Sequence, residues 1–431
     1  MLAACGSDDS STQTPSTTTA TGPDRFRGVT LNYLVDPFYA GDLATIAAEW
    51  TAVTGATVNQ RKSPDAVTTD RLIRLTAQDS DLDLLSLTSG ENAATYYSLG
   101  LLEPLDGAVD MRDDLWPDQR VTCFFAGKQY ALPYGNVPQA LYYDMDTVSR
   151  YGIKPPQSTS DAWTMDEAIA AWKTVQEGER ARRRTDQYWA CSFGFLGQIG
   201  FSYHGLQFPR SAASSRESPA FGGVSEDGLT ASGHLNHPEA LQGLQVYQDL
   251  YQPDRLGLFP LSTNTSIMPQ GKAAFWWAIP FSVGDIQKGG VVKRIGATPV
   301  PYIRTNMMIT GYSALGVSAR SRNKAAALDF ARFFSTRGVE YIATKNGTIP
   351  ARQSYVPRVP ALAKPPQSIF LEALKENGVS VVRTPGYSDY DSVVNRMLAD
   401  IANGSPVKSS ADSAAAKLDG LLKRYRPLPA P

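Results

Sequence analysis

The sequence predicts an α/β protein with a mainly parallel sheet, and two observations lead to this fold class. Apolar residues alternate along short segments such as GVTLNYLV at 28–35, which is the period of a β-strand. Amphipathic helical segments regularly follow these strands. Parallel strands of such a sheet end along one edge, so we expect ligand-binding loops at that edge.

The first strand–helix–strand unit follows residue 28. Asp42 is the expected N-cap of its helix, Gly55 is the expected end, and the extended segment 57–60 comes next. The pattern then repeats. We expect a helix near 64–79, a strand at 81–87, and a helix through Tyr96 and Tyr97 that stops at Gly100.

Three later helices are predicted from their end signals. Thr164 and Glu167 form a capping box for one helix, and residues 236–238 open another. A third helix, at 323–338, has one apolar face and is expected to stop at Gly338.

Charge indicates neither a nucleic acid nor an acidic membrane surface as a partner. The chain of 431 residues has 41 Lys and Arg against 42 Asp and Glu, which leaves a formal net charge of -1. The longest apolar run, at 273–283, is too short to span a bilayer and contains a proline. We therefore expect a globular protein of two to three average domain lengths that binds no nucleic acid.

Cysteine and histidine give no pattern typical of a metal site or a cofactor. The three cysteines are Cys5, Cys123 and Cys191, and no CxxC motif is present. Cys123 and Cys191 could pair in an exported protein, and the sequence leaves this open. His234 and His237 are three residues apart, but the adjacent proline and the missing third ligand argue against metal. We predict no cofactor.

The beginning of the chain resembles the lipobox of bacterial lipoproteins. The segment LAAC at 2–5 is followed, through residue 24, by residues that are nearly all Ser, Thr, Asp, Pro, Gly or Ala. The alternative is a chance match of four residues. The resemblance implies that Cys5 carries a diacylglyceryl anchor, and that the exported protein is held at the outer face of the cytoplasmic membrane.

A more specific resemblance lies at 127–157, which reads GKQYALPYGNVPQALYYDMDTVSRYGIKPPQ. It is similar to extracellular solute-binding proteins of ABC importers, in the carbohydrate-binding family 1 that includes maltose-binding protein. The matching residues are Gly127, Lys128, Tyr130, Pro133, Tyr142, Tyr143, Gly152, Pro155 and Pro156. Asp144 departs from the usual Asn. Further family-like stretches follow the same order, at 83–106, 268–281, 295–301 and 311–352.

This resemblance implies a two-lobed periplasmic-binding-protein-like fold with discontinuous lobes and a multi-strand hinge. The expected division is a lipobox remnant and tether at 1–24, lobe 1 at 25–136 plus 308–348, and lobe 2 at 137–307 plus 349–431. The implied protein is a monomer and not an enzyme. It captures a mono- to oligosaccharide between its lobes, closes by a hinge motion and presents the sugar to ABC permease membrane subunits.

A sugar site requires aromatic plates and hydrogen-bonding groups, so we look for these after strands and on the crossings. Candidates from the first lobe and the first crossing are Tyr33, Asp36, Phe38, Tyr39, Glu91, Asn92, Tyr134, Asn136 and Gln139. The remaining candidates are Trp189, Phe193, His204, Trp276, Trp277, Phe281, Tyr312 and Arg352. The family often places a stacking aromatic at the position of Phe281.

Each candidate also has a structural alternative. Asp36 and Glu91 also fit as helix caps, and one of Trp276 and Trp277 is expected to face the core. Arg352 could instead hold the hinge through a carboxylate.

Carboxylates in the expected site region favour an amino sugar, because a buried ammonium needs a paired charge. These are Asp36, Asp42, Glu91 and Asp144. Other possibilities are a glycerophosphodiester or another polar solute. A cell-envelope glycosidase would need two carboxylates at a defined separation, and a scaffold lipoprotein would bind no solute.

Overall fold

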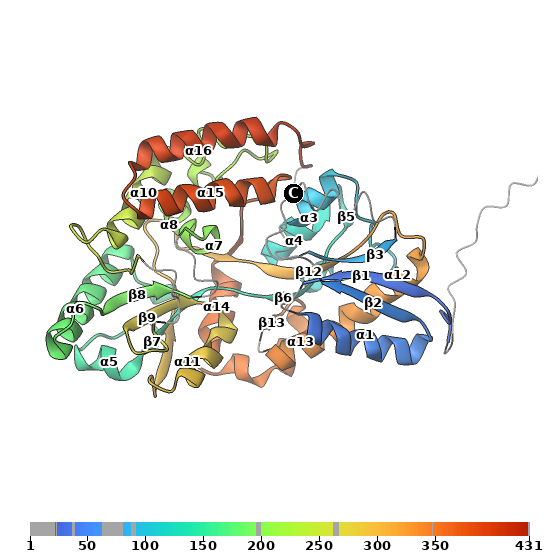
Figure 1. Ribbon diagram of the computed structural model, residues 1–431, viewed down its shortest axis with the longest axis horizontal. Helices are drawn as coiled ribbons and strands as arrows, with labels where there is room; N and C mark the ends of the chain where they lie inside the picture. Colours follow the sequence, from blue (N-terminus) through green and yellow to red (C-terminus); the bar gives the residue numbers. More distant parts are fainter. Residues whose placement is uncertain are drawn as a thin grey trace, which may run out of the picture.

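The computed structural model describes residues 22, 24–36, 39–62, 81–87, 92–194, 200–261, 267–346 and 348–429. Two large hydrophobic clusters are present, each built around its own β-sheet. Figure 1 shows the first sheet and its helices on the right and the second on the left. The predicted α/β class with two lobes is confirmed. Cys5 and the helix expected near 64–79 lie outside the described residues.

The first sheet has the strand order β13-β6-β12-β3-β1-β2. Its strands are β1 (Thr30–Val35), β2 (Thr57–Lys62), β3 (Leu82–Leu87), β6 (Leu132–Asn136), β12 (Tyr312–Val317) and β13 (Ile349–Pro350). β1 is parallel to β2 and β3, whereas β12 is antiparallel to β3 and β6. The ends of β1, β2, β3 and β6 therefore share one edge with the start of β12.

The helices of the first lobe are α1 (Ala40–Thr54), α3 (Asn92–Ser98), α4 (Pro117–Cys123), α12 (Lys324–Phe333) and α13 (Val339–Asn346). Gly55 ends α1 with φ 70°, as predicted. The prediction of Asp42 as N-cap is wrong: the N-cap is Tyr39, and Asp42 lies in the first turn. An acidic residue there still interacts favourably with the helix dipole.

The second sheet has the order β10-β7-β9-β8. Its strands are β7 (Ala140–Asp144), β8 (Trp189–Phe193), β9 (Ala273–Ala278) and β10 (Ile295–Thr298). The pairs Ala140↔Ala278 and Phe193↔Trp277 place the start of β7 and the ends of β8 and β9 at one edge. The chain enters β7 from the first sheet at this edge, so we call it, and the matching edge of the first sheet, the hinge-facing edges.

Helices cover the second sheet and extend the lobe. They are α5 (Met145–Arg150), α6 (Met165–Arg183), α7 (Ser202–Gly205), α8 (Gln207–Ser211), α9 (Pro219–Gly222), α10 (Pro238–Tyr251), α11 (Val283–Gly289), α14 (Gln367–Glu376), α15 (Tyr387–Ala402) and α16 (Val407–Leu422). The capping box of Thr164 and Glu167 is present at the start of α6. Pro238 begins α10, as predicted from the residues before it.

The chain passes between the lobes after β6, after β10 and after β13. Short elements accompany these crossings: β11 (Met308–Thr310) pairs with β14 (Gly378–Ser380), and 3-10 turns follow Arg352. The hairpin of β4 (Phe124–Phe125) and β5 (Lys128–Gln129) precedes the first crossing. The exact residues at which each lobe was predicted to begin and end remain a prediction.

The predicted helix stop at Gly338 is wrong. The backbone continues from α12 through a wide π-helical turn, Phe334–Gly338, into α13. A Cβ on Gly338 would lie 2.8 Å from the ring of Phe334. Glycine is therefore needed here for close packing of this ring rather than for ending the helix.

Cys123 and Cys191 are both buried and form no disulfide with each other, which answers the question that the sequence left open. Cys123 belongs to the hydrophobic cluster of the first lobe and Cys191 to that of the second. Residues in separate cores cannot approach to the distance that a disulfide requires.

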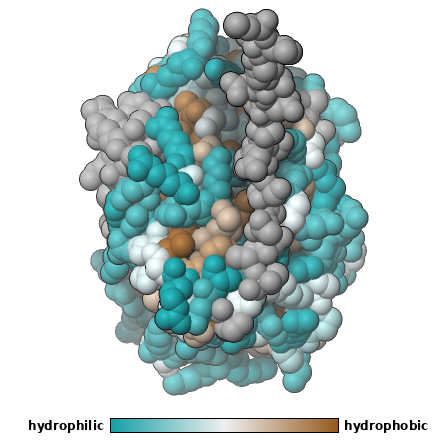
Figure 2. All heavy atoms as spheres, turned by 90° about the vertical axis from the view of Figure 1, so that its right-hand side faces the viewer, coloured by the Kyte–Doolittle hydropathy of each residue, from teal (hydrophilic) through white to brown (hydrophobic). Residues whose placement is uncertain are grey.

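The end of the first lobe presents a mostly hydrophilic surface. Figure 2 looks onto this end and shows apolar residues at a few places near the middle of the view, surrounded by polar ones. Large hydrophobic side chains that are exposed in the described chain are few: Val53, Leu99, Leu261 and Val291. No described helix has the length and apolar character needed to cross a membrane.

A buried carboxylate holds the far end of the second lobe together. The Glu179 side chain is fully buried and accepts hydrogen bonds from Arg150, Arg182 and Arg183 at 2.5–2.6 Å. Burial alone would raise the pKa of Glu179, but the hydrogen bonds from Arg182 and Arg183 outweigh this and lower it to about 2.

Glu179→Gln should therefore destabilise the protein by about 2 kcal/mol near neutral pH, because the arginines lose a charged acceptor. A lowered carboxyl pKa gives stability that is present above the ordinary value of 4.5 and is lost as the pH falls through about 2. Urea unfolding at pH 7 and pH 3 checks this. Glu177→Gln, on the exposed face of the same helix, is the control. Equal effects of the two substitutions would contradict the assignment.

Candidate functional site

Several of the predicted ligand residues, from distant parts of the sequence, lie at the hinge-facing edges of the two sheets. From the first sheet come Asp36, after β1, Asn136, at the end of β6, and Tyr312, at the start of β12. From the second sheet comes Phe193, at the end of β8. Phe38 and Glu91 lie outside the described residues, as does the side chain of Asn92.

Two tyrosines and a carboxylate form the first-lobe part of this region. Tyr39 and Tyr134 contact each other edge to face, with ring centroids 5.4 Å apart. Asp36 is 6% exposed, and its charge acts on both tyrosines. Burial raises the pKa of Tyr39 to about 12, so this hydroxyl keeps its proton at physiological pH. Both tyrosines are buried, and Tyr134 also packs against Phe334, so this group is part of the first-lobe core at the hinge-facing edge.

Tyr33 is a core residue in this structure. It is fully buried in the middle of β1, where its ring contacts Phe330 and its hydroxyl accepts a hydrogen bond from Ser86. The alternation that placed Tyr33 on one strand face did not distinguish the core face from a ligand face.

The first crossing carries a chain of polar side chains. Thr310 donates to Asn136, and Asn136 donates to Asp118 over 3.4 Å. Burial raises the pKa of Asp118 to about 7, although the hydrogen bond from Asn136 opposes this shift. The other oxygen of Asp118 and both amide atoms of Gln119 have no hydrogen-bond partner among the described residues.

Asp118 and Gln119 are not among the site residues predicted from the sequence. They lie on α4, which packs against β14 of the second lobe. No local pattern marks them, because their burial arises only when segments about 260 residues apart come together. Thr348 was missed for the same reason, and its buried hydroxyl has no partner among the described residues.

Gln139 connects the first crossing to the second lobe. Its amide nitrogen donates to the carbonyls of Tyr203 (2.7 Å) and Ile309 (3.0 Å). Its carbonyl oxygen accepts from the indole of Trp277 at 2.7 Å and faces the ring of His204 at 2.8 Å. The side chain is fully buried, so these contacts fix the crossing against α7 and β9.

The two neighbouring tryptophans of β9 are both almost fully buried. Trp277 packs against Phe193 and Phe208 in the second-lobe core. Trp276 lies against Gly194, where a Cβ would come within 2.6 Å of the indole. The Trp276 indole nitrogen has no partner among the described residues, so it is the one of the pair with an unused donor.

Three further candidates occupy different surroundings. Phe281 is half-buried in the turn that follows β9. Tyr312 accepts a hydrogen bond from the thiol of Cys123. Trp189 begins β8 and pairs with Ala273, so it lies at the edge of the second sheet opposite to the hinge-facing one. This position separates Trp189 from the other candidates.

Arg352 contacts a carboxylate, which is the alternative that its sequence position suggested. Its guanidinium donates to Asp114 at 2.7 Å and lies over the ring of Tyr355. Asp114 also accepts from Ser354, so the segment after β13 is held to the first lobe at this point.

Asp144 is also used structurally. It is the N-cap of α5, where it accepts from the backbone of Asp146 and the hydroxyl of Thr147. Its pairing with Ile295 places it at the edge opposite to the hinge-facing one. Four carboxylates favoured an amino sugar. Among those that the structure describes, Asp36 is buried at the hinge-facing edge.

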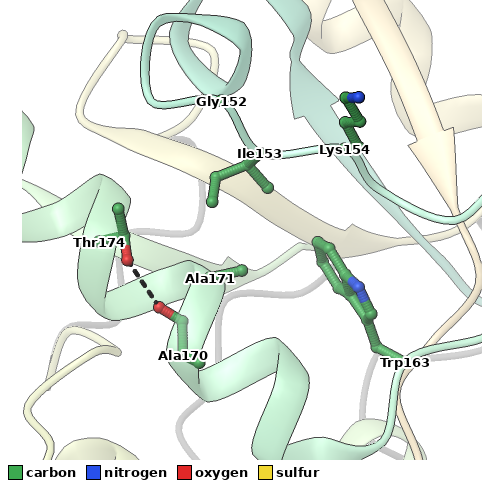
Figure 3. Close-up of a pocket in the computed structure, with 7 residues that line it drawn as sticks. All are labelled: Gly152, Ile153, Lys154, Trp163, Ala170, Ala171 and Thr174. Atoms are coloured by element: carbon green, nitrogen blue, oxygen red, sulfur yellow. Dashed lines mark hydrogen bonds between the residues drawn. The ribbon is translucent and has the colours of Figure 1, made fainter.

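A shallow pocket of about 320 Å³ lies elsewhere, on the α5–α6 side of the second lobe. Figure 3 shows Ile153 and Trp163 reaching toward Ala171 of α6, with Lys154 beside them. None of the predicted ligand residues lines it. Among the described residues, no cluster of His, Cys, Asp and Glu could hold a metal ion.

Comparisons with known proteins agree with this architecture. The family described as bacterial extracellular solute-binding protein matches residues 40–340. The maltotriose-binding protein of Pyrococcus abyssi is 24% identical over 262 residues, which are 58% of this chain and 51% of that protein. A probable ABC transporter-binding protein of Deinococcus radiodurans is 24% identical over 317 residues, which are 70% of each chain. The match to the first relative thus spans about half its length.

Solved structures show the same two-lobed fold. Maltose-bound MalE3 of T. maritima has a TM-score of 0.73 at 18% identity, covering 91% of this chain and 100% of that one. A solute-binding protein of Thermotoga lettingae, bound with α-D-tagatose, has a TM-score of 0.72 at 17% identity and the same coverage. The GacH receptor of Streptomyces glaucescens has a TM-score of 0.72 at 20% identity, covering 92% of this chain and 99% of that one.

The buried acid at the crossing gives a pH-dependent prediction. A carboxyl whose folded pKa is raised gives stability that is fully present below 3.8 and is lost as the pH rises through about 7. Asp118→Asn lacks this dependence, so at pH 8 it should be more stable than the parent, by at most about 4 kcal/mol. At pH 4 the two should differ little.

Unfolding in urea across pH 4–8 measures this difference. The control is Asp113→Asn, because Asp113 is exposed on the turn just before α4. The prediction is wrong if the free energy of unfolding of the parent does not fall relative to that of Asp118→Asn between pH 4 and pH 8. Ionisation of Asp118 would then not destabilise the folded protein.

Proposed function

Since the chain belongs to the bacterial extracellular solute-binding protein family, we propose that it is the carbohydrate receptor of an ABC importer. It binds a mono- to oligosaccharide between its two lobes and delivers it to the permease subunits in the membrane. The family consists of binding proteins, so the sugar is released unchanged.

One arrangement supports the choice of a sugar: aromatic rings and hydroxyl or carboxylate groups lie at or next to the hinge-facing edges of both sheets. Tyr39, Tyr134 and Asp36 belong to the first lobe, and Phe193 and Phe281 to the second. A sugar has apolar ring faces and a rim of hydroxyls, so it needs both kinds of group. Closure of the lobes around it would supply contacts from both sides.

The similar proteins support the same ligand class. The relative from Pyrococcus abyssi is named for maltotriose, and the similar structures are described with maltose and with α-D-tagatose. These ligands are neutral sugars of different length. The proposal for this chain therefore stays with carbohydrates as a class.

We also propose that the protein is exported and anchored by lipid on Cys5. The small residues before Cys5 and the polar segment after it support this. A diacylglyceryl group supplies the pair of acyl chains that stable anchoring to a membrane requires. The segment up to residue 24 would then serve as a tether between the membrane and the first strand.

An amino sugar is the finer form of the proposal, and Asp36 supports it. A buried carboxylate favours a ligand ammonium, because both charges are then paired away from water. Asp144 no longer contributes to this argument, since it caps α5. The competing solute is a glycerophosphodiester or another polar non-sugar compound, whose phosphate Asp36 would repel.

A ligand panel tests the proposed class. We expect thermal stabilisation by one or more of maltose, maltotriose, D-tagatose and glucosamine, because a ligand that binds only the folded state stabilises it by about 2.7 kcal/mol at a hundredfold excess over Kd. Differential scanning fluorimetry at millimolar concentrations measures this, with recovery of the unhydrolysed sugar by chromatography.

Glucose 6-phosphate and a glycerophosphodiester are included as the competing class. Stabilisation by these alone would replace the carbohydrate proposal. Hydrolysis of a bound sugar would favour a glycosidase, and no stabilisation by any compound would favour a scaffold lipoprotein.

Charge-removing variants test the amino sugar. Asp36→Asn and Glu91→Gln should weaken glucosamine binding about tenfold or more while changing glucose binding less, since only glucosamine loses a charge pair. Isothermal titration calorimetry measures both affinities. Asp144→Asn is the control because Asp144 caps a helix. Equal losses for both sugars in Asp36→Asn and Glu91→Gln would remove the charge argument.

A further inference from the structure

His204 has two hydrogen-bond acceptors and, in its neutral form, one proton. Its Nδ1 lies 2.8 Å from the side-chain oxygen of Gln139, and its Nε2 lies 2.8 Å from the carbonyl oxygen of Gly194. A neutral imidazole carries an N–H on only one of its two nitrogens. At any moment one of the two contacts therefore lacks its proton.

The orientation of Gln139 is fixed, so the conflict cannot be removed by exchanging its amide atoms. The Gln139 nitrogen donates to two backbone carbonyls, and its oxygen accepts from the indole N–H of Trp277 at 2.7 Å. An exchanged amide would lose these three bonds. The oxygen must therefore face His204.

The ring is also held neutral. His204 is 1% exposed, and burial lowers its pKa to about 4. A second proton, which would satisfy both acceptors, is therefore disfavoured at physiological pH. The ring stacks on Phe193 at a centroid distance of 5.1 Å and an interplanar angle of 7°, so it cannot turn away freely.

The two acceptors lie on different segments of the chain. Gly194 directly follows β8 at the hinge-facing edge of the second sheet. Gln139 lies on the first crossing. The neighbour of His204 on α7, Tyr203, also holds the crossings: its hydroxyl donates to Val137 and accepts from the backbone of Gly311 at 3.1 Å.

We propose that His204 is a positioning residue that couples the Gly194 end of β8 to the hinge by sharing one ring proton between Gly194 and Gln139. When a ligand hydroxyl or lobe closure turns the Gly194 carbonyl away, the proton stays on Nδ1 and strengthens the bond to Gln139. When Gly194 takes the proton, the Gln139 contact loosens. The ligand part of this inference rests on the proposed function.

The position of the proton can be observed directly. The protein has three histidines, so the full chain labelled with ¹⁵N-histidine gives few side-chain signals, and His204→Gln identifies those of His204. Long-range ¹H–¹⁵N spectra distinguish the Nδ1–H and Nε2–H tautomers. In the ligand-free protein we expect shifts averaged between the two forms, and no second protonation above about pH 5 because the pKa is about 4.

Two variants should move the proton in opposite directions. Gln139→Leu removes one acceptor and should leave only the Nε2–H form. Trp277→Phe removes the competing donor to Gln139 and should shift the ring toward Nδ1–H. A merely structural histidine would show one tautomer in all three proteins. If the parent shifts equal those of Gln139→Leu, Gln139 never holds the proton and the inference is wrong.

Ligand addition separates this inference from the proposed function. Maltose, at a concentration where scanning fluorimetry shows binding, should move the parent ring toward Nδ1–H, and His204→Gln should bind maltose about tenfold more weakly. Binding without a change of tautomer contradicts the coupling. If maltose does not bind, only the proposed function loses support, because the ligand-free comparison of the three proteins still decides where the proton lies.

Discussion

The fully buried amide of Gln139 is the interaction on which the junction of the lobes depends. It joins the first crossing to the backbone of α7, to the return crossing at Ile309 and to Trp277 of β9. A buried amide that loses its partners costs about 1–3 kcal/mol for each unsatisfied group. The first crossing is therefore anchored to the second lobe at Gln139.

The direction of the strands around this crossing decides which residues face the junction. The crossing leaves β6 and enters β7 at the hinge-facing edges, so the ends of β1, β6 and β8 are directed toward the same region. Asp36, Asn136 and Phe193 reach it because each comes at the end of its strand or directly after it. Trp189 and Asp144 are in the same sheet as Phe193, but the strand direction takes them to the opposite edge.

The features predicted well from the sequence are those set by local physics. The alternation of apolar residues predicted β1, and the left-handed conformation at the end of α1 is one that glycine adopts readily, as at Gly55. The capping box of Thr164 and Glu167 predicted the start of α6. Local signals failed where packing decides. Gly338 makes room for a ring rather than ending a helix, and Asp118 becomes a buried acid only when α4 meets β14. The separate burial of Cys123 and Cys191 follows from the two cores, which spacing along the chain does not reveal.

Several of the buried polar groups that lack partners among the described residues lie near the first crossing or at a hinge-facing edge. Among the described residues they include an oxygen of Asp118, both amide atoms of Gln119, the hydroxyl of Tyr134 and the indole nitrogen of Trp276. Each lies on an element that borders the junction or a hinge-facing edge. A fold selected only for stability would replace such groups with apolar ones, because each costs free energy while it stays unpaired. A bound solute or a water molecule that hydrogen-bonds to these groups would recover this free energy.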